Sequence, residues 1–167
     1  MKNIKSLLLI FSFMFTLSLA VSAQNLTSLD GGKVDVQNQK GKVVVLSIGA
    51  SWLPLSAQQA IITNKLAKKF AGRDVVIYFV ATDSTATKSK NYASDEELGT
   101  FATRNKLTVS VLRDSDGSQT LKKYAIDQLP SFVILGKDGK PATEAFGGID
   151  PKSDISVSIA EAINRIL

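Results

Sequence analysis

The sequence predicts an α/β fold in which a central mixed β-sheet carries helices on both faces. Two β-branched runs, residues 42–50 and 74–82, are typical of strands buried on both sides. Amphipathic segments at residues 56–70 and 153–167 have the spacing of helices that pack one face on a core. Strands that alternate with such helices are typical of layered α/β domains.

The first 23 residues have the pattern of a secretory signal peptide. Lys2 and Lys5 precede an apolar run over residues 7–21, and small residues end at Ala23. This run falls short of the ~20 apolar residues of a membrane span. We therefore expect cleavage after Ala23, a periplasmic or secreted protein without stable membrane insertion, and one domain over residues 24–167. An N-terminal anchor that stays uncleaved is the alternative.

The first half of this domain is expected to form a hairpin and then a strand, a helix and a strand. Residues 26–35 contain Asp-Gly-Gly between two short alternating runs, which predicts an N-terminal β-hairpin extension. The helix at residues 56–70 is lysine-rich near its end, which suits the helix dipole, and Gly72 stops it.

The second half repeats the alternation with shorter elements. Ser94 and Glu97 form a capping-box pattern at the start of a helix. A short strand is expected at residues 109–112, then a turn at 114–117 and a short helix to residue 124. Residues 131–148 predict a hairpin around a Lys-Asp-Gly-Lys turn, before the closing helix at residues 153–167.

The composition excludes several classes of chemistry. The chain has no cysteine and no histidine. Thiol chemistry, serine–histidine and cysteine–histidine hydrolysis, and typical zinc sites are therefore excluded. Loss of residues 1–23 removes two lysines and no acid, which lowers the formal charge from +5 to +3. This mild excess is spread along the chain, so no nucleic-acid partner is expected.

Several motifs together resemble the thioredoxin superfamily, in particular its exported TlpA-like (ResA-like) branch. Residues 40–56 read KGKVVVLSIGASWLPLS, with Trp52 and Pro54 at family positions, and residues 124–140 read YAIDQLPSFVILGKDGK. The resemblance covers residues 26–167 and implies a thioredoxin-like fold with Pro130 at the family's cis-proline. Asp83 after the second long strand and the glycine pair at residues 147–148 also match.

The sequence departs from this family where the family's chemistry takes place. Leu53 stands at the position of the attacking cysteine and Ser56 at that of the resolving cysteine. Ala125 replaces the usual glycine. Thiol–disulfide exchange needs a thiolate, so the family's redox activity is not implied for this chain, and no catalytic residue is assigned.

A binding site is the remaining candidate, and its residues lie in two segments. They are Trp52, Leu53, Pro54, Leu55, Ser56, Leu129 and Pro130. Trp52, Leu53 and Leu55 would form an exposed apolar patch of the kind that marks contacts, or they would fold back onto the domain. Ser56 is expected to cap or start the helix, with Pro54 in its first turn.

The segment at Leu129 and Pro130 also has two interpretations. In the family it resembles, the backbone beside the cis-proline pairs with an extended substrate, which would allow peptide docking by strand addition. The alternative is a turn that the fold itself requires. No metal or cofactor is expected, because "DSDGS" at residues 114–118 lacks the downstream glutamate of a calcium loop. Residues 95–97 are acids of a helix's first turn rather than a catalytic pair.

Three functions remain open. The first is a redox-inactive module that binds another exported protein or peptide through residues 52–56 and Pro130. The second is an enzyme that acts with a partner or cofactor supplying the reactive group. The third is a structural domain of an exported assembly. The sequence leaves the oligomeric state open.

Overall fold

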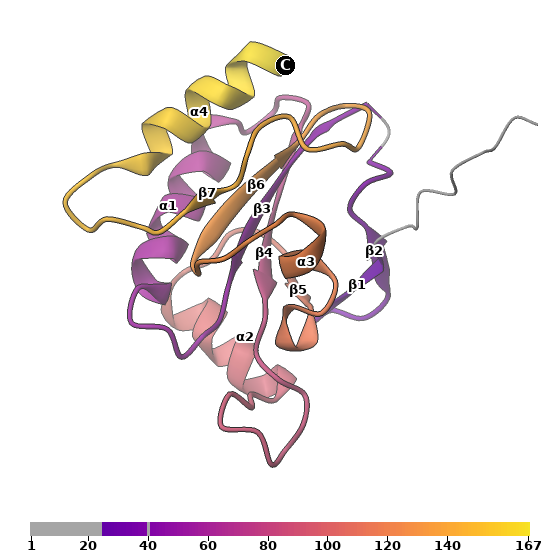
Figure 1. The fold of residues 1–167 in the computed structure, drawn as a ribbon, viewed down its shortest axis with the longest axis vertical. Coiled ribbons are helices and arrows are strands. Elements are labelled where there is room, and N and C mark those ends of the chain that lie inside the picture. Colours follow the sequence, from indigo (N-terminus) through magenta and orange to yellow (C-terminus); the bar gives the residue numbers. More distant parts are fainter. Residues whose placement is uncertain (1–24, 40) are drawn as a thin grey trace, which may run out of the picture.

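The computed structural model describes residues 25–39 and 41–167, and the predicted signal segment at residues 1–23 lies outside them. In the described part, one sheet has seven strands in the order β2-β1-β5-β4-β3-β6-β7 (Figure 1). The strands are β1 (Asn25–Ser28), β2 (Lys33–Asp35), β3 (Val43–Gly49), β4 (Val75–Ala81), β5 (Val111–Arg113), β6 (Ser131–Leu135) and β7 (Phe146–Gly147). The helices are α1 (Ser56–Lys69), α2 (Asp95–Arg104), the 3₁₀ turn η1 (Ser115–Gly117), α3 (Thr120–Lys123) and α4 (Ile155–Ile166).

The sheet is mixed, as the sequence predicts. Strands β3, β4 and β5 run parallel, and β6 runs antiparallel to β3. The N-terminal hairpin of β1 and β2 extends the sheet beyond β5. All seven residues of β3 are buried, because helices or loops cover both sides of the sheet centre.

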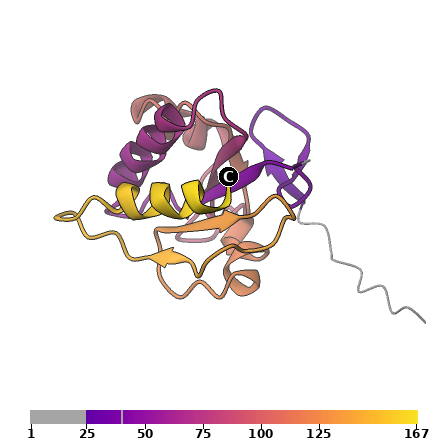
Figure 2. The ribbon, with the colours of Figure 1, turned by 90° about the horizontal axis from the view of Figure 1, so that it is seen from above.

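Helices lie on both faces of this sheet (Figure 2). On one face, α1 and α4 pack against Val43 and Val45 of β3, and α2 packs on the neighbouring part around Phe79. On the other face, Leu46 of β3 lies in a second core cluster with Tyr124 from the end of α3. The alternation of buried side chains along β3 therefore divides the core into two layers.

Side-chain caps mark the first turns of two helices, α2 and α4. The Ser94 hydroxyl accepts from the Glu97 N–H at 3.1 Å, and the Ser94 N–H donates to the Glu97 carboxylate at 2.7 Å. This confirms the predicted capping box of α2. Helix α4 begins two residues later than the predicted residue 153, because Asp154 caps it by accepting from the Ser156 N–H.

Two predicted strands differ from the observed ones. Strand β5 begins at Val111 rather than at residue 109. The second arm of the predicted hairpin at residues 131–148 contributes only a bridge at Pro141 and the two residues of β7. Proline lacks the N–H that would continue the ladder. None of the helices in the described residues is long and apolar enough to cross a membrane.

Candidate functional site

The predicted binding residues meet at one edge of the sheet, beyond the carboxyl ends of the parallel strands. Gly49 and Ala81 pair at the ends of β3 and β4. Ile48 pairs with Ser131, the first residue of antiparallel β6. The loop after β3 and the segment before β6 therefore lie side by side. The register brings residues 52–56 and residues 129–130 to the same end of the molecule.

The loop after β3 is a pair of tight turns. The Leu53 N–H donates to the Ala50 carbonyl at 3.2 Å, and the Ser56 N–H donates to the Leu53 carbonyl at 3.0 Å. Trp52 is 53% exposed, and Pro54 is exposed as well. Both leucines are half-buried, but only Leu55 packs against a core cluster of the described residues.

Ser56 starts α1 but does not cap it. The prediction that Pro54 lies in the first turn of α1 is wrong, because Leu55 occupies the N-cap position without a side-chain cap and Pro54 precedes the helix. Ser56 is 6% exposed, and its hydroxyl donates to the Ser51 carbonyl at 3.1 Å. A hydroxyl held in this way has no base to activate it, and the chain has no histidine to supply one.

A buried carboxylate fastens this loop to the neighbouring strand. Asp83 follows β4 and is fully buried. Its carboxylate accepts the Ser51 N–H at 3.0 Å and the Ser51 hydroxyl at 2.6 Å. Both hydrogen bonds have a carboxylate as acceptor, and bonds to a carboxylate are stronger than those between neutral groups. The position just before Trp52 is therefore fixed by the end of β4.

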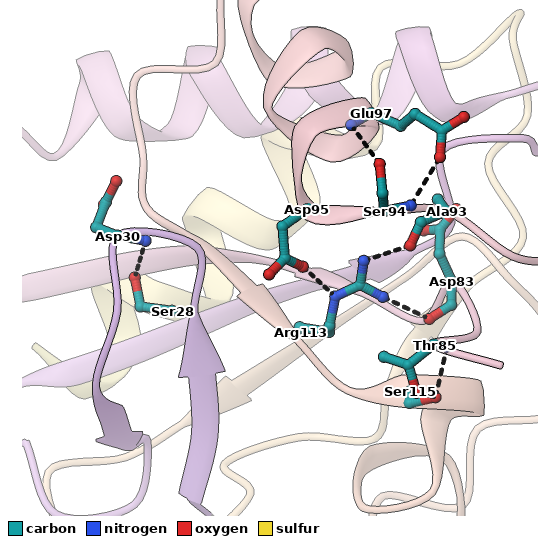
Figure 3. A network of polar contacts seen from close by, with 10 residues as sticks. All are labelled: Ser28, Asp30, Asp83, Thr85, Ala93, Ser94, Asp95, Glu97, Arg113 and Ser115. Atoms are coloured by element: carbon teal, nitrogen blue, oxygen red, sulfur yellow. Dashed lines mark hydrogen bonds and ion pairs between the residues drawn. The ribbon is translucent and has the colours of Figure 1, made fainter. Parts of the chain in front are cut away.

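Arg113 at the end of β5 extends this network to α2 (Figure 3). Its guanidinium contacts the Asp95 carboxylate at 2.7 Å and donates to the main-chain carbonyls of Asp83 and Ala93. The arginine side chain is 9% exposed, whereas that of Asp95 is 70% exposed. Asp95 thus has a specific partner in addition to its favourable place in the first turn of α2.

A buried polar trio lies under the start of α1. The Gln59 amide and the Thr63 hydroxyl lie 2.9 and 2.8 Å from the Ser47 hydroxyl, and all three residues are fully buried. The approach of Gln59 depends on Gly49, because a Cβ there would lie 2.2 Å from Gln59 Oε1. Gln59 Oε1 has no hydrogen-bond partner among the described residues.

The second predicted segment is also tightly packed. The Leu129–Pro130 peptide bond is cis, as expected, and Pro130 is buried. Leu129 is half-buried and packs against the second core cluster. Gly148 has a φ of +69°, and a Cβ there would lie 2.6 Å from Gln128 Oε1. The glycine pair thus lets the chain after β7 approach the segment that precedes Pro130.

Asp114, the first acidic residue of "DSDGS", accepts several hydrogen bonds at the start of α3. Asp114 is 1% exposed. Its carboxylate accepts hydrogen bonds from the backbone N–H groups of Gln119 and Thr120 and from the Thr120 hydroxyl. It organises the start of α3, in agreement with the predicted turn and helix. Among the described residues, no group of three or more acidic, histidine or cysteine side chains is placed to hold a metal ion.

The sequence indicated that Asp83 follows the second long strand, but it did not indicate the hydrogen bonds from Ser51. Nor did it indicate the contacts of Arg113 or the trio around Ser47. A charged residue at the end of an apolar run was the available signal for Asp83, because a charge so close to a buried strand needs a partner. Arg113 follows two apolar residues in the same way, but its partners lie 18 to 30 residues away and could not be identified from the sequence.

Comparisons with known proteins agree with this architecture. A model of the AhpC/TSA family matches residues 18–141. The thiol-disulfide oxidoreductase ResA of Bacillus thuringiensis is 27% identical over 121 residues, which are 72% of this chain and 64% of that protein. The chain therefore spans less than two thirds of the length of this relative.

Solved structures show the same fold. A thioredoxin-like protein from Aeropyrum pernix has a TM-score of 0.67 at 18% identity, over 86% of this chain and 89% of that one. The pneumococcal exposed lipoprotein thioredoxin Etrx1 from Streptococcus pneumoniae has a TM-score of 0.64 at 26% identity, over 84% and 99% of the two chains. The thioredoxin-like resemblance seen in the sequence is confirmed.

Proposed function

The chain belongs to the AhpC/TSA family and has no cysteine, and from this we propose that it is a redox-inactive binding module. In this proposal, residues 52–56 and the segment at Leu129 and Pro130 dock an exported protein or peptide. The fold is that of thiol-disulfide oxidoreductases, and the reactive pair is replaced by Leu53 and Ser56.

Loss of redox activity follows from the side chains at these two positions. Leucine cannot ionise, and thiol–disulfide exchange needs one thiol to attack and another to resolve. The Ser56 hydroxyl donates to a backbone carbonyl and is buried. We therefore expect no turnover of insulin disulfides or peroxide by the pure protein. Turnover would favour the alternative, an enzyme that uses a partner's or cofactor's reactive group.

The observation that best supports docking is an exposed tryptophan in a loop that hydrogen bonds to Asp83 hold in place. Trp52 is 53% exposed, and the preceding residue, Ser51, is held by the buried carboxylate of Asp83. Tryptophan is enriched among residues that dominate binding energy at interfaces. A loop held in place before binding loses less conformational entropy when a partner arrives.

We also propose that the protein acts outside the cytoplasm. The pattern of residues 1–23 supports export. A structural relative, Etrx1, is described as an exposed lipoprotein. A partner would accordingly be another exported polypeptide.

Photo-cross-linking in the native compartment tests this function. A photoreactive amino acid is placed at position 53, and a control probe replaces Glu161, which is exposed on α4. The docking proposal expects one discrete adduct from position 53 that the probe at position 161 does not give. A folded and abundant protein without a specific adduct at position 53 would contradict the proposal and favour the structural role.

A further inference from the structure

A pocket of about 370 Å³ lies beside the segment that contains Pro130. Residues 124–127, in the connection from α3 to β6, contribute one part of its lining. Glu144, Ala145 and Gly147, at and before β7, contribute another part, and Ser131 completes it. Strand β7 is an edge strand of the sheet, and this connection runs beside it in Figure 2. The volume falls within the range of pockets that hold small ligands or single side chains.

The charge of this pocket is opposite to that of the chain. Asp127 and Glu144 are both exposed and come from different segments of the lining. Within the described part of the chain, neither carboxylate has a hydrogen bond or ion pair. No lining residue is basic, although the whole chain has a formal charge of +5. A concave surface lined by one sign of charge concentrates ligands of the other sign.

The remaining lining is suited to an aliphatic chain. Ile126 and Ala145 are half-buried and belong to the apolar layer around Tyr124. Burial raises the pKa of the Tyr124 phenol, and the negative charge of Asp35 adds to this effect, so the phenol stays neutral. A lysine or arginine side chain matches both the apolar residues and the carboxylates of the lining. Such a side chain buries its apolar stem and keeps its charged end at the rim. A bare metal ion would not contact the apolar part.

The pocket is also placed where a polypeptide would pass. Ser131 and Gly147 of its lining pair with each other across β6 and β7. Strand β7 is the last strand of the sheet, so its outer edge has no neighbouring strand in the described fold. An extended chain bound next to Pro130 would thus run along an open edge, with the pocket within reach of one of its side chains.

We propose that this pocket receives a lysine or arginine side chain of the docked polypeptide, with Asp127 and Glu144 contacting its charge. The proposal rests on the proposed docking function and adds a specificity to it: partners carry a basic residue next to the segment that lies at Pro130.

NMR titration of the purified, ¹⁵N-labelled protein tests this specificity. The probe is N-acetyl-lysine methylamide, and the matched neutral probe is N-acetyl-norleucine methylamide, which keeps the stem and lacks the amine. We expect saturable shifts in the amides of residues 125–127, 131 and 147 with the lysine probe only. Changing Asp127→Asn together with Glu144→Gln should weaken this binding at least about tenfold, because two attractive charges are lost. Glu161→Gln, which removes one exposed carboxylate elsewhere, is the control.

Three results would overturn the proposal. The norleucine probe could bind as well as the lysine probe, or the double variant could bind unchanged while its spectrum shows an intact fold. Cadaverine, a free diamine, could bind while the lysine probe does not, which would indicate a small-molecule site. These outcomes are separable from failure of docking itself, because the adduct at position 53 is measured without reference to the pocket.

Discussion

Ser51 donates both its backbone N–H and its hydroxyl to the buried carboxylate of Asp83, and this links the loops that follow β3 and β4. Asp83 also accepts from Arg113 through its main-chain carbonyl. At the sheet edge where other members of the family have their cysteine pair, hydrogen bonds among Ser51, Asp83 and Arg113 hold the loops of this chain together. These bonds hold the exposed Trp52 in a chain that has neither cysteine nor histidine.

Asp83→Ala should lower the free energy of unfolding by roughly 2–4 kcal/mol, because it empties a fully buried position and leaves two donors of the half-buried Ser51 without their acceptor. Urea denaturation measures this change. Ser51→Ala removes only the hydroxyl and should cost less than Asp83→Ala. Glu161→Ala, at an exposed helical position, serves as the control. A loss no larger than that of the control would contradict the role given to Asp83.

Leu53→Asp should abolish the partner adduct and leave the fold intact, because Leu53 is only half-buried and belongs to no core cluster of the described residues. The adduct is then recorded from a photoreactive probe at Trp52. Ile61→Asp is the matched control, since Ile61 is 49% exposed on α1 and outside the tip. Equal loss of the adduct in both variants would argue against a site at the tip.

Cysteines at positions 53 and 56 should form a reversible disulfide. The Ser56 N–H donates to the Leu53 carbonyl in a turn, which places the two Cα atoms within about 7 Å, close to the range that a disulfide spans. A cysteine that begins α1 would also have a lowered thiol pKa.

Maleimide labelling before and after reduction measures the bond, and dithiothreitol-dependent insulin reduction measures activity. The native chain and the single variant Leu53→Cys should be inactive in this assay. If the double variant stays reduced under oxidising conditions, the geometry of the turn no longer suits the family's reaction.

Two glycines should respond to alanine in opposite directions. Gly49→Ala places a Cβ against Gln59 and should destabilise the protein by about 1–3 kcal/mol. Gly99→Ala, in open space within α2, should stabilise it by about 0.5–1 kcal/mol. Thermal or urea unfolding separates the two cases, and a neutral Gly49→Ala would show that Gln59 moves aside without cost.

Stability should fall above pH 10, in part through Tyr124. Burial raises the pKa of this phenol in the folded state above its ordinary value of 10.0. The folded state then holds the proton more tightly, so this stabilising contribution is complete below pH 10 and is lost as the pH rises towards the folded-state pKa. Tyr124→Phe should flatten the alkaline decline in unfolding free energy. Tyr92→Phe, at an exposed position, is the control substitution.

The fold was predictable because its signals are local. The runs that became β3 and β4 are apolar over most of their length, with Ser47 as the exception in β3, and the Ser94–Glu97 capping box is complete within four positions. The second arm of the last hairpin was less predictable. A turn signal at residues 137–140 says nothing about how far the ladder continues beyond Pro141.

The site was predictable in outline only. Trp52 and Pro130 could be assigned from motifs, and the register of β3 with β6 then brings them to one edge. The bonds that hold this edge join residues distant in sequence, such as Ser51 with Asp83 and Arg113 with Ala93. Such pairs depend on the direction of loops after strands, which no local pattern encodes.

The trio of Ser47, Gln59 and Thr63 has a consequence for how α1 seats on the sheet. The apolar contacts of a helix on a flat strand surface change little if the helix slides by one turn, about 5.4 Å. A slide here would separate the Gln59 amide and the Thr63 hydroxyl from the hydroxyl of Ser47. The Thr63 hydroxyl would keep the Gln59 carbonyl as its acceptor within the helix, but the buried Gln59 amide would lose this partner at a cost in free energy. The three polar groups therefore favour one position of α1 along the sheet over other positions that would bury a similar apolar area.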